Sequence, residues 1–242
     1  MLEAVLFDWG DTLMEFAYDP ELVAAGHRAG LAAIGRDDVP EVEALTERFR
    51  EAYEPFFWVP GTVEEIEYPG LVRRLLGDFG VTVDDEELGR YLEAEHAAWD
   101  PARRLAAHTH ALLEALRERD LRLGLVSNAF DPPWLLERDL AQMGIAERLD
   151  SSVFSSGVGM RKPHPLIFER ALTELGVEPE RALFVGDRLY EDVRGAGEVG
   201  MTTVQAVWFR ADEHPDGREP DYQAFTQMDV LNIVARLARS RA

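Results

Sequence analysis

The residues best suited to chemistry in this chain stand directly after short apolar runs, or just before a segment with helical periodicity. They combine carboxylates, a small hydroxyl, an amide and an ammonium: Asp8, Ser127, Asn128, Lys162, Asp187 and Asp192. Carboxylates bind hard divalent cations and can attack phosphorus, whereas hydroxyl and ammonium groups can bind the oxygens of a phosphoryl group. The set predicts a site for a divalent cation, a phosphoryl group and a nucleophile.

The ammonium is unusual in this composition. Lys162 is the only lysine of the chain, and all the other basic residues are arginines. A lysine is a compact point charge, whereas an arginine presents a wide planar fork. A solitary lysine could be an accident of the surface, but beside these carboxylates we expect Lys162 to balance their charge and that of the phosphoryl group.

The elements that must position these residues alternate along the chain. Apolar runs typical of buried strands lie at residues 4–7, 121–126, 182–185 and 201–207, with a weaker run at 152–154. Helical periodicity is found at residues 110–119, 133–143, 165–175, 190–199 and 230–238. The alternation predicts an α/β fold, a Rossmann-like parallel sheet with helices on both faces. Ligands of such sheets bind beyond the carboxyl ends of the strands, where the polar residues stand.

The alternation is interrupted once, because about 100 residues separate the first two strands. Residues 20–99 have a largely helical pattern, for example at 41–49, 71–76 and 86–92, and are too long for an ordinary connection. We therefore predict a helical domain at residues 16–100, inserted into a core formed by 1–15 and 101–242. The aromatic residues of this domain are expected to pack in its core or line a substrate entrance: Tyr53, Phe56, Phe57 and Trp58.

Composition excludes several classes of protein. The chain has 242 residues, 46% of them hydrophobic and 29% charged, which is typical of a globular fold. Its formal net charge of -21 repels nucleic acid and anionic membranes, so neither is an expected partner. The absence of cysteine excludes disulfides and thiolate chemistry. Residues 1–4 lack a signal-peptide layout, and we expect a cytoplasmic protein whose oligomeric state the sequence leaves open.

Four short segments give a more specific indication. They are residues 7–13 (FDWGDTL), 126–128 (VSN), 162–163 (KP) and 185–187 (VGD), the last followed by Asp192. In this order, with a helical insertion after the first, they resemble the haloacid dehalogenase-like hydrolase superfamily, in particular its members with a helical cap. The resemblance covers the whole chain, and it implies the helical-cap version of the Rossmann-like fold.

The resemblance also implies a function and a role for each residue. It implies a Mg²⁺-dependent hydrolase that cleaves a small phosphate monoester through an aspartyl-phosphate. The implied metal-site residues are Asp8, which is also the nucleophile, the backbone carbonyl of Gly10, Asp187 and, around them, Asp192. The implied phosphate-binding residues are Thr12, Ser127, Asn128 and Lys162, with Ser127 and Lys162 also assisting catalysis. Glu191 is a less certain participant.

One position departs from the family pattern. Phosphatases of this superfamily usually carry an acid–base aspartate two residues after the nucleophile, where this chain has Gly10, and Asp11 stands where the family more often has glycine. A positioned acid–base group contributes about 10²–10⁴ in rate. Either Asp11 or Glu15 replaces it as a catalytic group, or the substrate has an activated leaving group, or the protein is an impaired phosphate-binding or regulatory module.

Two other branches of the superfamily also lack that aspartate. Phosphonate-cleaving relatives need a lysine in the cap, and the only lysine here belongs to the core, so this branch is excluded. Relatives that are 2-haloacid dehalogenases attack carbon without a metal, whereas Gly186-Asp187 is typical of a metal-binding segment. Dehalogenation is therefore the less favoured alternative.

Overall fold

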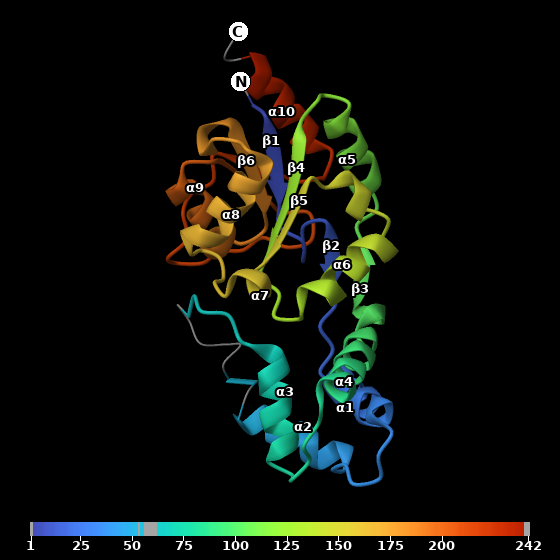
Figure 1. Ribbon diagram of the computed structural model, residues 1–242. Coiled ribbons are helices and arrows are strands. Elements are labelled where there is room, and N and C mark those ends of the chain that lie inside the picture. Colours follow the sequence, from blue (N-terminus) through green and yellow to red (C-terminus); the bar gives the residue numbers. More distant parts are fainter. Residues whose placement is uncertain (1, 53, 56–61, 240–242) are drawn as a thin grey trace.

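The main body of the protein is a six-stranded parallel sheet, seen in the upper half of Figure 1. The computed structural model describes residues 2–52, 54–55 and 62–239. The strands, in the spatial order β5-β4-β1-β6-β7-β8, are β1 (Ala4–Phe7), β4 (Arg122–Ser127), β5 (Ser151–Phe154), β6 (Ala182–Gly186), β7 (Thr202–Ala206) and β8 (Tyr222–Ala224). The predicted α/β fold is confirmed, and β8 adds a short edge strand to the five that were predicted.

Helices cover both faces of this sheet (Figure 1). Alternate residues of the central strand β1 point to opposite faces: Val5 and Phe7 pack in one apolar cluster, Ala4 and Leu6 in another. The first cluster includes residues of α5 (Thr109–Arg117), α6 (Pro133–Gln142) and α10 (Asp229–Arg239), and the second includes residues of α8 (Pro165–Leu175) and α9 (Gly195–Val199). Burial on both faces explains why β1 is uniformly apolar.

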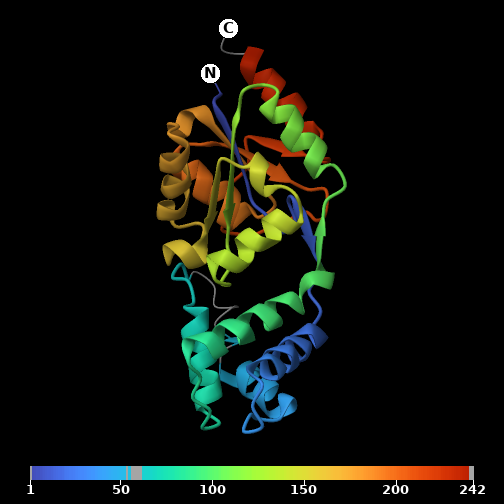
Figure 2. The ribbon, with the colours of Figure 1, turned by 45° about the vertical axis from the view of Figure 1, so that its right-hand side comes forward.

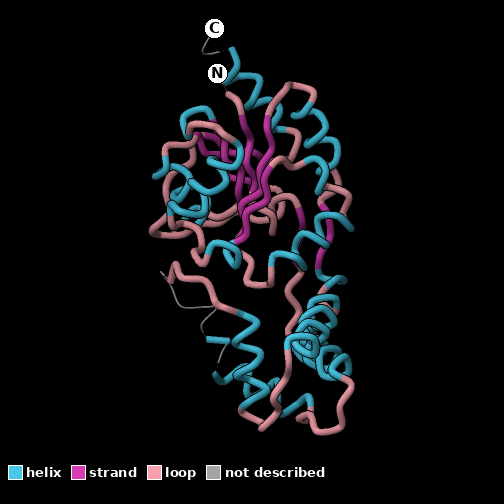
Figure 3. Tube along the Cα trace, viewed as in Figure 1, coloured by secondary structure: helices cyan, strands magenta, loops and turns pink. Residues whose placement is uncertain are grey.

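A separate group of helices lies below the sheet, and Figure 3 shows the strands gathered outside it. These helices are α1 (Glu21–Ile34), α2 (Val42–Ala52), α3 (Tyr68–Gly77) and α4 (Asp85–Ala97). They pack around an apolar cluster that includes Leu45, Leu75 and Tyr91 and that Leu135 of α6 joins from the sheet body. We call residues 21–97 the helical unit.

Two connecting segments of the chain join the helical unit to the sheet body, and they run side by side (Figure 2). They contain β2 (Met14–Phe16) and β3 (Arg103–Leu105), which pair antiparallel in the register Met14 with Leu105. The predicted boundary at 15/16 falls within β2, and the one at 100/101 falls two residues before β3. Three residues are too short a run to show an alternating pattern, which is why neither strand was predicted.

The remaining elements are short. They include α7 (Ser155–Val158), a π-helical turn (Leu189–Arg194) that runs into α9, and the 3₁₀ turns Asp100–Ala102, Ala146–Arg148 and Pro179–Arg181. The helix predicted over residues 190–199 is therefore divided between the π turn and α9. The aromatic residues 53 and 56–58 lie outside the described residues. Within the described residues, no helix combines the length and apolar character needed to cross a membrane.

Candidate active site

Three carboxylates meet where the strands end. Asp8 follows β1, Asp187 follows β6, and Asp192 lies in the π turn after Asp187. All three side chains are buried, and each offers an oxygen within 4.8 Å of the others. The parallel sheet brings them together, because β1 and β6 are neighbours in the same register and end at the same edge.

Lys162 joins two of these carboxylates. Its ammonium donates hydrogen bonds of 2.6 Å to Asp8 Oδ1 and 2.9 Å to the carbonyl of Val126, and it forms an ion pair with Asp192 Oδ1 at 2.7 Å. Burial acts to lower the pKa of the ammonium, but the charges of Asp192 and Asp8 outweigh burial and raise that pKa above its usual value. The lysine is therefore a fixed positive charge at the centre of the cluster.

The cluster nevertheless carries more negative charge than Lys162 balances. Burial, together with repulsion from Asp192, raises the pKa of Asp8 to about 6, although Lys162 opposes the shift. Burial and repulsion from Asp192 and Asp8 raise the pKa of Asp187 to about 8, against the lowering effect of Arg210. Carboxylates held so close together bind a proton readily, and a divalent cation is stabilised in such a place for the same reason.

The donor set fits a hard divalent cation such as Mg²⁺. Asp187 Oδ1 is buried and makes no hydrogen bond to the described residues, so it is free to coordinate. Asp192 is fixed beside it, because its Oδ2 accepts a 2.9 Å hydrogen bond from the Arg188 backbone N–H. Gly186 permits this packing, since a Cβ there would come 2.4 Å from the Asp192 Cγ. Clustered carboxylate oxygens are the ligands that Mg²⁺ prefers.

The residues predicted to bind phosphate occupy the same edge of the sheet. Ser127 ends β4 and is buried, and the buried Thr12 hydroxyl has no hydrogen-bond partner among the described residues. Asn128 is engaged with Lys162: its Oδ1 accepts from the Lys162 backbone N–H at 2.7 Å, and its Nδ2 donates to the Lys162 carbonyl at 3.2 Å. Asn128 thus holds the lysine segment in place.

The structure shows the backbone conformation and the surroundings of Gly10 and Asp11, the two positions that depart from the family pattern. Asp11 has a φ of 55°, in the left-handed region that favours glycine. Its Oδ1 accepts a 3.2 Å hydrogen bond from the Phe16 N–H, and its Oδ2 lies 3.6 Å from Arg210 Nε. A Cβ at Gly10 would have no heavy atom within 4 Å, so a side chain has room there. Glu15 is exposed on β2.

Arg210 is a member of the site that the sequence did not reveal. Its Nε and Nη2 lie 2.7 and 2.5 Å from Asp187 Oδ2. The segment is anchored to the loop after β1 by Trp208, whose Nε1 donates a 3.0 Å hydrogen bond to the Thr12 carbonyl. The available signal was its place just after the strand predicted at 201–207, which gives one more strand end at this edge.

The comparison with protein families agrees with this geometry. The haloacid dehalogenase-like hydrolase family matches residues 2–200. The chain belongs to this family. The hydrolase is 28% identical over 243 residues to glyceraldehyde 3-phosphate phosphatase from Methanopyrus kandleri, covering 99% of this chain and 100% of that one. It is 32% identical over 227 residues to phosphoserine phosphatase from Thermus thermophilus, covering 90% of this chain and 79% of that one.

Solved structures of the family share the fold of this hydrolase. The 2-haloacid dehalogenase from Pseudomonas syringae pv. Tomato DC3000 superposes with a TM-score of 0.70 at 25% identity, covering 98% of this chain and 100% of that one. The relatives named as phosphatases support the phosphatase activity predicted from the sequence.

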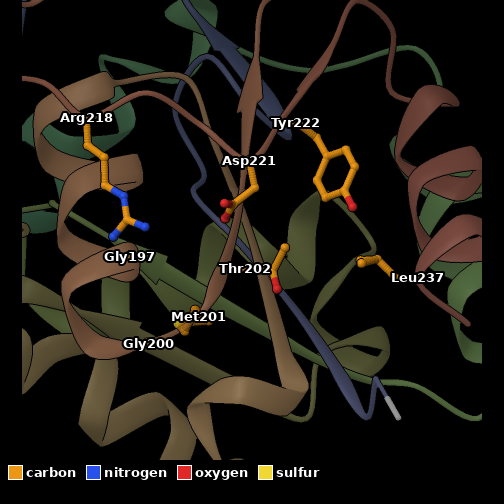
Figure 4. Close-up of a pocket in the computed structure, with 8 residues that line it drawn as sticks. All are labelled: Gly197, Gly200, Met201, Thr202, Arg218, Asp221, Tyr222 and Leu237. Carbon is orange, nitrogen blue, oxygen red and sulfur yellow. The ribbon is translucent and has the colours of Figure 1, made fainter. Parts of the chain in front are cut away.

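A surface pocket of about 350 Å³ lies away from this site (Figure 4). It is lined by Thr202, the first residue of β7, and by Arg218 and Leu237 among others. Asp8 and Asp187 directly follow the last residues of β1 and β6, so this pocket is at the opposite end of the sheet. It contains none of the carboxylates of the cluster and is distinct from the candidate active site.

Proposed function

We propose that this hydrolase is a Mg²⁺-dependent phosphatase that cleaves a small phosphate monoester through an aspartyl-phosphate at Asp8. The observation that carries the proposal is the bridging of Asp8 and Asp192 by the buried Lys162 ammonium, beside the free oxygen of Asp187. The names of the relatives, glyceraldehyde 3-phosphate phosphatase and phosphoserine phosphatase, support a small phosphorylated substrate.

In the first step an Asp8 oxygen forms a bond to phosphorus while the ester P–O bond breaks, and the alcohol leaves with a proton from solvent or a nearby acid. Lys162, Ser127 and Thr12 would stabilise the negative charge on the phosphoryl oxygens. In the second step water attacks phosphorus, inorganic phosphate departs, and the Asp8 carboxylate is restored. This sequence divides one difficult displacement into two easier ones.

The metal would be held by Asp8, Asp187 and the Gly10 carbonyl, with Asp192 beside them. Bound Mg²⁺ would neutralise charge on the transferring phosphoryl group, which is the main requirement of phosphoryl transfer. Lys162 then has a second function, since it holds Asp8 in a fixed orientation through the 2.6 Å contact. Asp192 in turn holds Lys162 at 2.7 Å.

The helical unit would act as a cap that excludes water and selects the substrate. The cap domain predicted from the sequence spans residues 16–100, between the two parts of the core, and contains the helical unit. The paired strands β2 and β3 bring both connecting segments together, and this arrangement supports a single hinge between the helical unit and the sheet body.

The glycine at position 10 bears on substrate preference. Asp11 is directed toward Phe16 and Arg210, and neither contact involves the nucleophile. We therefore expect aryl and acyl phosphates, whose leaving groups need little protonation, to react faster than alkyl phosphates. We also expect a burst of product before slow turnover, because hydrolysis of the aspartyl-phosphate lacks a base. Equal rates on alkyl and aryl esters without a burst would contradict this part of the proposal.

The decisive experiment is a broad screen of phosphate esters with and without EDTA, with Asp8→Asn as the control. We expect wild type to hydrolyse at least one ester, EDTA to abolish the activity, added Mg²⁺ to restore it, and Asp8→Asn to be inactive. If wild type and Asp8→Asn are equally inert with every ester, the phosphatase proposal fails and an impaired phosphate-binding module takes its place.

A second candidate activity is 2-haloacid dehalogenation. It is favoured by the similarity to the Pseudomonas syringae enzyme and by Gly10, since a halide leaves without a proton. The metal-binding chemistry of the three carboxylates disfavours it. The same screen should therefore include 2-chloropropionate, from which we expect no release of chloride.

A further inference from the structure

One carboxylate of the helical unit reaches the sheet body and is buried there. Glu65 lies between α2 and α3, and its side chain is only 1% exposed. Its Oε1 lies 2.9 Å from Arg161 Nη1, and its other oxygen accepts a short hydrogen bond from the Ser155 hydroxyl. A buried carboxylate is costly unless it is paired, so this contact defines how the segment docks.

The backbone reinforces the same contact. The Glu65 N–H donates to the Gly159 carbonyl at 3.0 Å, and the Arg161 N–H donates to the Val63 carbonyl at 2.7 Å. Glu64 and Met160 form an antiparallel bridge between these two hydrogen bonds. The helical unit therefore pairs directly with the segment that ends one residue before the catalytic lysine.

Both partners of Glu65 lead to the active site. Arg161 immediately precedes Lys162, whose backbone is held at both ends by the Asn128 amide. The Ser155 hydroxyl also accepts a 2.8 Å hydrogen bond from the N–H of Ala129, the residue after Asn128. One carboxylate thus connects the helical unit both to the loop that carries Lys162 and to the loop of Asn128, which holds the Lys162 backbone.

We propose that Glu65 is a positioning residue: docked on Arg161 and Ser155, it fixes the Lys162 segment and so couples closure of the helical unit to the catalytic lysine. The inference rests on the proposed function, and it extends that function by assigning the helical unit a part in catalysis. Removal of the Glu65 charge leaves Arg161 without this ion pair and loosens the loop that carries Lys162, which the backbone hydrogen bonds and Asn128 still hold.

The test uses Glu65→Gln, Arg161→Gln and their combination. Glu64→Gln is a matched control, because it removes the same charge from an adjacent, exposed residue. We expect each single variant to lose about tenfold in kcat with less than about a threefold change in KM. The double variant should lose no more than either single variant, since both remove one contact. Arg161→Gln removes the same ion pair from the side of the sheet body. It therefore tests the proposal even if a Glu65 variant does not fold.

A second readout is independent of activity. Because Lys162 is the only lysine, selective ¹⁵N-lysine labelling gives a single backbone amide signal, that of the N–H bonded to Asn128. We expect hydrogen exchange at this amide to be about tenfold faster in Glu65→Gln and Arg161→Gln, and unchanged in Glu64→Gln.

The two readouts separate the two proposals. Faster exchange in a protein that hydrolyses no phosphate ester would support the positioning role and reject the phosphatase activity. An active enzyme in which Glu65→Gln leaves Lys162 exchange at the wild-type rate would overturn the positioning role, whatever happens to kcat.

Discussion

Replacement of Lys162 by methionine removes the charge at the centre of the cluster while keeping an unbranched side chain of similar length. Lys162 is 3% exposed, and its ammonium contacts Asp8 at 2.6 Å and Asp192 at 2.7 Å. Removing one partner of a buried ion pair costs about 3–5 kcal/mol. At about 1.36 kcal/mol per factor of ten, kcat/KM should fall by about 10²–10⁴.

The assay is initial-rate hydrolysis of the best ester from the screen, with urea unfolding to establish that each variant is folded. Arg170→Met is the control, because it removes a positive charge from an exposed face of α8. We expect the control to keep its activity within about twofold. A folded Lys162→Met enzyme that stays within tenfold of wild type would refute the assignment of Lys162 to the reacting centre.

Three further predictions concern glycine positions and a buried histidine. Gly10→Asp places a carboxyl group in open space, and it should raise kcat on alkyl phosphates at least about tenfold; no gain would indicate that another group supplies the proton. Gly186→Ala drives a Cβ into Asp192 and should weaken Mg²⁺ binding measured by calorimetry, whereas Gly89→Ala, with open space around it in α4, should slightly stabilise the fold. Burial lowers the pKa of His27 to about 4, so the unfolded chain takes up the proton first, and this group should contribute a loss of about 2 kcal/mol to the free energy of unfolding between pH 7.5 and 5. Urea unfolding of wild type and His27→Gln at both pH values should show this loss as the difference between the two proteins, because the other titrating groups are common to both.

The sequence predicted the parts of the fold that depend on continuous apolar runs. Strands β1, β4, β6 and β7 lie where expected, because each is buried on both faces and can be recognised from a few residues. The three-residue strands β2, β3 and β8 were missed, since their pairing depends on partners far along the chain. Local pattern cannot reveal such pairing.

The candidate site divides in the same way. Asp8, Asp187, Asp192 and Lys162 were predicted from their positions after strands or within family segments, and the structure brings them together. Arg210 was not predicted, because an arginine after a strand is common in a chain rich in arginine.

Glu65 was missed for a related reason. It is one of many acidic residues in a chain of net charge -21, and nothing in its neighbourhood distinguishes it from a solvated glutamate. Only the fold shows that it meets Arg161 in a buried contact. At the candidate site, Lys162 and a divalent cation would oppose the negative charge of Asp8, Asp187 and Asp192.

The central claim is that Asp8 becomes covalently phosphorylated, and the most direct measurement is mass spectrometry of the acid-quenched enzyme during turnover of an aryl phosphate. Because Gly10 supplies no base for the second step, the phosphoenzyme should accumulate. We predict a mass increase of one phosphoryl group, located on the peptide that contains Asp8 and absent from Asp8→Asn. An enzyme that turns over the ester while this peptide stays unmodified, or an active Asp8→Asn variant, would contradict the account.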